Sequence, residues 1–173
     1  MGVIGIILGN LRNMRRAKKL RAMPRAELLA MDDEAFYDAM ECITEDAVYE
    51  ITDPALNREQ ILAYTLIMLE TEVNNGGLCQ FFVNSSRQCA PYVSEALEAV
   101  GALGIRELFD SFVRGNGIDI QDLSSFRISR VEEFEEQTKR FDFDAFDDRF
   151  YEDSALHQQI IDFLRKHVEQ IVK

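Results

Sequence analysis

The chain has 173 residues, of which 47% are hydrophobic and 29% charged, and its formal net charge is −12. This length fits one domain with a hydrophobic core of its own, and the composition excludes a disordered chain. The strong acidity disfavours direct binding of nucleic acid and favours a basic partner. We therefore expect a folded, acidic protein of the interaction type.

Three cysteines, Cys42, Cys79 and Cys89, are an odd and scattered set without a CxxC pair. They predict neither a disulfide framework nor a thiol-rich zinc site, and reduced thiols indicate a cytoplasmic location. The two histidines, His157 and His167, stand apart near the end of the chain, and no HExxH, P-loop or GxSxG pattern occurs. The sequence therefore predicts no cofactor, no metal site and no catalytic residue.

The charge is divided unevenly along the chain. Residues 1–26 hold seven basic residues and no acidic one, whereas the remaining 147 residues hold 12 basic against 31 acidic residues, a net charge of −19. This division predicts an apolar and basic N-terminal arm at 1–23, followed by an acidic domain at 24–173.

Within the arm, the apolar residues 3–11 precede the basic run, which is the opposite order to that of a secretory signal. The apolar stretch is also too short to span a bilayer as a helix. Packing of the arm on its own domain or on a second copy is the favoured interpretation. The alternative is contact of the arm with a membrane surface, apolar residues in the lipid and basic residues on the headgroups.

The first elements of the acidic domain carry clear helix signals. Pro24 predicts a helix start, and Asp32 is expected to cap the next helix. Four apolar residues share one face of that second helix: Phe36, Met40, Ile43 and Ala47. After a break at Asp53-Pro54, Asn57 and Gln60 have the spacing of a capping box.

The segment 61–73 is apolar nearly all round, which is typical of a central helix, here expected near 58–74. Asn74-Asn75-Gly76-Gly77 ends this helix, and a short one restarts over 78–83. Further helices are expected at 91–100, 105–113 and within 121–140. Ser154 is expected to cap the last helix, whose apolar stripe is Leu156, Ile160, Phe163/Leu164, His167/Val168 and Ile171.

No strand alternation accompanies these helices, so the sequence predicts an all-α fold, a single compact multi-helix bundle.

The most distinctive segment runs from Glu70 to Ser86 at the end of the central helix. Its two glycines permit a tight reversal between packed helices, and its polar side chains can satisfy backbone groups left unpaired at two helix ends. We expect this structural role for Glu70, Glu72, Asn74, Asn75, Gly76, Gly77, Gln80 and Asn84. The alternative is an enzyme of unknown reaction, using Glu70 and Glu72 in a polar cleft.

Between Glu70 and Ser85 the chain reads E-x-E-V-N-N-G-G-x-x-Q-F-F-x-N-S, and two weaker patterns stand at Ala96–Ala102 and at Phe146–Tyr151. In these patterns the chain resembles, over roughly residues 30–172, a bacterial family that includes a dimeric DNA-mimic protein. The resemblance implies an all-α fold, a homodimer and a negative surface that occupies the DNA-binding face of a transcription factor. The basic arm does not belong to the family pattern.

Ten acidic residues form what we call the acidic strip: Glu132, Glu133, Glu135, Glu136, Asp142, Asp144, Asp147, Asp148, Glu152 and Asp153. Three basic residues, Lys139, Arg140 and Arg149, oppose them. Because DNA presents about one charge per 1.7 Å of its axis, such carboxylates can engage the same lysines and arginines. Interleaved aromatic residues are expected to anchor the strip to the core: Phe134, Phe141, Phe143, Phe146, Phe150 and Tyr151.

We therefore predict a non-enzymatic protein whose acidic strip binds a basic protein, such as a DNA-binding protein or transcription factor, by mimicking phosphate charge. A merely solvated acidic face is the simpler interpretation of the same residues. A third possibility is an immunity or adaptor protein with a membrane-associating arm.

Overall fold

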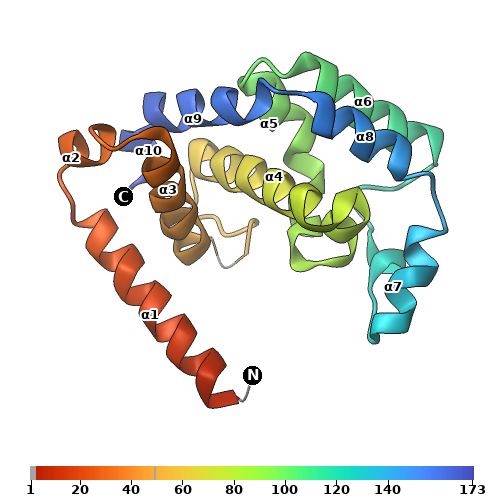
Figure 1. Cartoon of the computed structure of the whole chain (residues 1–173), viewed down its shortest axis with the longest axis horizontal. Helices are drawn as coiled ribbons and strands as arrows, with labels where there is room; N and C mark the ends of the chain where they lie inside the picture. Colours follow the sequence, from red (N-terminus) through yellow and green to blue (C-terminus); the bar gives the residue numbers. More distant parts are fainter. Residues whose placement is uncertain (1–2, 49) are drawn as a thin grey trace. The chain divides into compact units, whose positions relative to one another are not determined.

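The computed structural model describes residues 3–48 and 50–173, with the side chains of residues 3–11 and Val131 left out. The described residues form α-helices and two short 3₁₀ helices, with no strand among them (Figure 1). The α-helices are α1 (Val3–Arg21), α2 (Arg25–Leu29), α3 (Asp33–Ala47), α4 (Arg58–Val83), α5 (Val93–Ala99), α6 (Leu103–Gly115), α7 (Val131–Thr138), α8 (Asp144–Glu152), α9 (Leu156–Lys166) and α10 (Val168–Ile171). The 3₁₀ helices are η1 (Ser85–Tyr92) and η2 (Ser124–Phe126). The all-α prediction is confirmed.

The chain forms two compact units. Unit 1 contains the residues up to Tyr64 together with Ile161–Lys173, and unit 2 contains Thr65–Ile160. The boundary between the units lies within α4 and within α9. The division into an arm at 1–23 and a domain at 24–173 stays a prediction.

In unit 1, the expected helix signals act as predicted. Pro24 directly precedes α2, and Asp32 caps α3 because its Oδ1 accepts the N–H of Ala35 at 2.8 Å. Phe36, Met40 and Ile43 on α3 are all fully buried.

Helix α1 packs against α3. Ala17 is fully buried and Leu20 nearly so, and Arg21 forms an ion pair with Asp46. Five basic side chains of α1 remain exposed: Arg12, Arg15, Arg16, Lys18 and Lys19. The second half of the arm therefore packs on its own domain, while the apolar side chains of 3–11 lie outside the described residues. Within the described part of the chain, no helix has the length and apolarity needed to cross a membrane.

The C-terminal segment is tied to the start of α4 within unit 1. The predicted capping box is confirmed, since the N–H groups of Asn57 and Gln60 donate to each other's side-chain oxygens at 3.0 and 2.8 Å. The amide of Gln60 also donates to the carbonyl of Ile171 at 3.1 Å, and that of Asn57 to the carbonyl of Gln170 at 2.8 Å. The same two side chains thus start one helix and hold the end of another.

Helix α4 is the predicted central helix. Every residue from Leu62 to Glu70 is buried, and the regular backbone ends at Gly76 and Gly77, which have non-helical dihedral angles. Gly77 has φ of 76° and ψ of 176°, a conformation open essentially to glycine alone. The helix resumes after this kink, as the Asn-Asn-Gly-Gly pattern predicts.

The helix expected within 121–140 is present as α7, which follows the short η2. One expectation for the last third of the chain was wrong. Ser154 does not cap the last helix; Asp153 does, its Oδ1 accepting the N–H groups of Ala155 and Leu156 at 2.9 Å. Helix α8 was not anticipated at all.

Stacked phenylalanines form much of the core of unit 2. The ring of Phe82 stacks on that of Phe126 at 4.9 Å between centroids, and Phe146 stacks on Phe150 at 5.9 Å. Phe143, Phe146 and Phe150 are buried, so these three anchor the acidic strip as predicted. Tyr151 is 54% exposed, whereas Phe134 and Phe141 are half-buried.

The kink gives a stability prediction. A Cβ at Gly77 would overlap the Asp147 carboxylate and would require an unfavourable φ, so we expect Gly77→Ala to lower the free energy of unfolding by about 3 kcal/mol. The control is Gly117→Ala, where φ is also positive, at 61°, but the space around a Cβ is open. We expect about 1 kcal/mol there, from the backbone alone. Equal losses in urea unfolding would show that Asp147 does not hold this kink.

Candidate functional site

The carboxylate of Glu72 connects the two sides of the α4 kink. Its Oε2 accepts hydrogen bonds from the side-chain amides of Gln80 at 2.7 Å and Asn84 at 2.8 Å. Its Oε1 accepts the hydroxyl of Ser86 at 2.8 Å. A residue before the kink therefore binds three side-chain donors after it, rather than the unpaired backbone groups expected from the sequence.

Glu70 is 6% exposed, and its carboxylate lies 3.1 Å from Nδ1 of His157 on α9. Both side chains make further interactions. The sequence had left these two residues unconnected, because 87 positions separate them. Asn74 and Asn75 are exposed. Glu70 and Glu72 are thus both hydrogen-bonded, and the structural and enzymatic interpretations of these residues stay predictions.

The second family pattern, at Phe146–Tyr151 in α8, packs directly on the first. Oδ1 of Asp147 accepts the N–H of Leu78, the first residue after the kink, at 2.8 Å. The hydroxyl of Tyr151 donates to the carbonyl of Val73, before the kink, at 2.6 Å. Helix α8 therefore clamps both sides of the kink, and the two patterns form one structural unit.

This contact separates the acidic strip into two groups. Three members are half-buried and engaged with the fold: Asp147 at the kink, Asp153 at the start of α9, and Glu133, whose Oε2 accepts the N–H of Ser129 at 2.6 Å. The other seven are exposed: Glu132, Glu135, Glu136, Asp142, Asp144, Asp148 and Glu152. The exposed seven are the members available to a partner.

Two of the three basic residues of the strip, Arg140 and Arg149, lie against neighbouring side chains. The guanidinium of Arg140 lies over the rings of Phe126 and Phe141, at 5.5 and 5.1 Å, and that of Arg149 lies 3.7 Å from Glu152. Three carboxylates of α7 have no ion-pair partner among the residues whose side chains are described: Glu132, Glu135 and Glu136. These three exposed glutamates of α7 therefore carry negative charge that no described ion pair neutralises.

Two of the half-buried members of the strip have pKa values shifted in opposite directions. Burial raises the pKa of Asp147, and the carboxylates of Asp144 and Asp148 add to this, while the N–H of Leu78 partly offsets it. The pKa of Glu133 is lowered, chiefly by the N–H of Ser129 and the side chain of Arg130.

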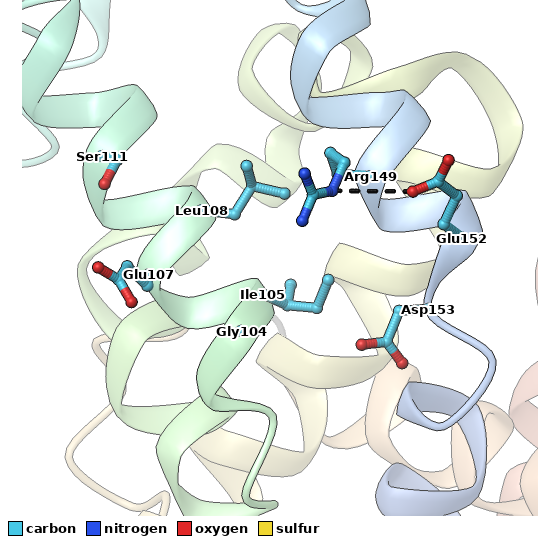
Figure 2. Close-up of a pocket in the computed structure, with 8 residues that line it drawn as sticks. All are labelled: Gly104, Ile105, Glu107, Leu108, Ser111, Arg149, Glu152 and Asp153. Atoms are coloured by element: carbon cyan, nitrogen blue, oxygen red, sulfur yellow. Dashed lines mark ion pairs between the residues drawn. The ribbon is translucent and has the colours of Figure 1, made fainter.

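A groove of about 590 Å³ lies between α6 and α8 in unit 2 (Figure 2). Its lining residues are Gly104, Ile105, Glu107, Leu108, Ser111, Arg149, Glu152 and Asp153. Only the last two belong to the acidic strip, and none belongs to the Glu70–Ser85 motif. Sequence reasoning missed the groove because it depends on the pairing of two helices, of which α8 was not anticipated.

The three cysteines are buried free thiols. Burial raises the pKa of Cys89 to about 12 and that of Cys79 to about 11, which keeps both in the unreactive thiol form. No group of His, Cys, Asp and Glu suited to a metal ion occurs within the described part of the chain.

The raised pKa of Asp147 gives a pH prediction. The folded chain holds the Asp147 proton more tightly than the unfolded chain, so ionisation of Asp147 reduces stability as the pH rises from 3.8 through the raised pKa. Asp147→Asn keeps an oxygen for the N–H of Leu78 and does not ionise. We expect its free energy of unfolding to rise relative to the wild type as the pH rises from 3.8 through the raised pKa of Asp147.

Urea unfolding at several pH values measures this difference. Glu152→Gln is the control, an exposed change on the same helix that removes the same charge and leaves the N–H of Leu78 bonded to Asp147. A constant difference for Asp147→Asn would contradict the inward position of its carboxylate.

Comparison with known proteins adds one finding. A family model described as DMP19-like protein matches residues 54–167, which is more than half of the chain and includes the Glu70–Ser85 motif, the groove and the whole acidic strip. No match was found among curated proteins or among solved structures. The resemblance inferred from the motifs is thereby confirmed, and the chain belongs to the DMP19-like family.

Proposed function

We propose that this protein is a non-enzymatic binding protein whose acidic strip engages a basic, DNA-binding protein by presenting carboxylates in place of DNA phosphates. The observation that carries the proposal is the set of seven exposed carboxylates on α7, α8 and the loop between them. Membership of a DNA-mimic family supports the same reading.

The spacing of the carboxylates suits this role. Glu132, Glu135 and Glu136 are three and four residues apart on α7, which places their Cβ atoms about 5–6 Å apart. A DNA strand carries one phosphate per about 3.4 Å, so lysine and arginine side chains that follow a phosphate backbone can meet such a row. Like charges at this spacing weaken a helix, although Glu132 lies in the first turn of α7, where the helix dipole favours a carboxylate.

The partner expected for such a surface is a protein with a cluster of lysine and arginine residues, such as a transcription factor. Its binding should weaken as salt concentration rises, because exposed charges are screened. A homodimer and a cytoplasmic location, both expected from the sequence and the family, belong to the same proposal. The hydrogen-bonded state of Glu72 and the burial of Glu70 support the absence of an enzymatic role.

The proposal predicts the effect of neutralising α7. The triple change Glu132→Gln, Glu135→Gln and Glu136→Gln should weaken capture of a DNA-binding protein from host lysate by about tenfold at low salt, since three exposed charges are removed. The captured protein is identified by mass spectrometry, and duplex DNA should compete with the wild-type chain for it.

The matched control changes net charge equally at exposed acids of unit 1, with Glu27→Gln, Glu34→Gln and Asp38→Asn. This control should leave capture within about twofold of the wild type. If the two triple variants weaken capture equally, the partner responds to the net charge of the protein and not to the acidic strip. Capture that DNA does not compete with, or that salt does not weaken, would refute the mimic.

A further inference from the structure

The groove between α6 and α8 combines an apolar wall with carboxylates. Helix α6 contributes Ile105 and Leu108, which Figure 2 shows directed towards α8. Three carboxylates, Glu107, Glu152 and Asp153, border the groove against one guanidinium, that of Arg149. Such a lining suits a side chain with an aliphatic stem and a cationic head.

Arg149 already lies in this position. Figure 2 shows its side chain reaching into the space between the helices, with Leu108 on one side and Glu152 on the other. Its Nε is 3.7 Å from Oε2 of Glu152, and the two side chains are 73% and 76% exposed. An ion pair this exposed contributes little to stability, so Arg149 can leave the groove at small cost.

An arginine is the cation that fits best. Its planar guanidinium can bind a carboxylate through two N–H groups and can lie flat on an apolar side chain, neither of which a lysine ammonium does. Glu152 supplies the carboxylate, and Leu108 supplies the apolar surface. Helix α8 joins the groove to the acidic strip, because Asp144 and Asp148 precede Arg149 on the same helix.

We propose that the groove between α6 and α8 receives an arginine side chain of the basic protein partner, which displaces Arg149 from Leu108 and Glu152. The inference rests on the proposed function, because it names how one residue of that partner is held. Arg149 then acts as a resident competitor: the free chain fills its own site with the same chemical group that the partner offers.

The probe for this site is tetra-arginine, added to the full chain labelled with ¹⁵N. Chemical-shift changes should concentrate on the amides of the groove, including Gly104, Ser111 and Arg149. Replacement of the competitor, Arg149→Gln, should lower the dissociation constant of tetra-arginine by about fivefold.

The matched control is Arg130→Gln. Arg130 is 74% exposed and pairs with Glu133 three residues later, as Arg149 pairs with Glu152, but it lies outside the groove. Its change removes the same charge and should alter the dissociation constant by less than about twofold. Equal gains for the two variants would mean that tetra-arginine responds only to net charge, and the proposal would be wrong.

A second pair of variants tests occupancy. Ser111→Lys places an ammonium at the groove, four residues after Glu107. It should raise the dissociation constant of tetra-arginine by about fivefold. Ala99→Lys, four residues after Glu95 on an exposed site of α5, makes the same change of charge outside the groove and should have little effect. If the two lysines act equally, the groove is not the site.

The outcomes also separate this inference from the proposed function. If Ser111→Lys leaves capture of the DNA-binding protein intact while the α7 triple variant weakens it by about tenfold, the mimic stands and the groove proposal fails. If tetra-arginine binds the groove but no basic protein is captured, the groove site stands as an arginine site and the mimic fails. If inorganic phosphate rather than tetra-arginine shifts the groove amides, Arg149 forms an anion site and the inference is overturned.

Discussion

The arrangement of unit 2 depends on how the kink of α4 is satisfied. Gly77 takes a backbone conformation that leaves the N–H of Leu78 outside the regular ladder of helix hydrogen bonds, and the carboxylate of Asp147 accepts it. Glu72 gathers three further donors from the far side of the kink. An unmade bond at a buried position costs about 1–3 kcal/mol, so this one turn of the chain accounts for Glu72 and Gln80 of the first pattern and for Asp147 and Tyr151 of the other. Asn74 and Asn75 are exposed and take no part in these bonds.

The same contact sets the geometry of the acidic surface. Asp147 and Tyr151 fix α8 against the kink, and the buried rings of Phe146 and Phe150 fix its underside. Asp144 and Asp148 are then left on the exposed side. Asp147, which the sequence counts as one member of a uniform acidic strip, therefore supports the helix that carries other members. Counting it as available charge overstated the number of carboxylates that a partner can reach.

Local signals predicted much of the fold, and non-local ones account for what was missed. The Asn57–Gln60 capping box, the Asp32 cap and the all-round apolar α4 depend on residues within a few positions of each other, and all three are present. Helix α8 is nine residues long and strongly acidic, so its intrinsic tendency to form a helix is weak. Its formation depends on packing against the core, which local sequence does not reveal. The groove and the Glu70–His157 pair join segments far apart in sequence, which periodicity does not detect.

The two short acidic helices that carry most of the exposed carboxylates, α7 and α8, need support from the rest of the fold to be stable. Isolated helices of eight or nine residues are unstable in water, and like charges three or four positions apart weaken them further. The phenylalanines beneath α8 offset this by burial, and Arg140 adds a guanidinium stacked on Phe126 and Phe141. Because the supported carboxylates are held on packed helices rather than on a free acidic tail, less conformational entropy is lost when a partner binds them. The proposed mimic therefore depends on the buried aromatic residues as well as on the carboxylates, because the packed rings fix the positions from which the carboxylates meet a partner.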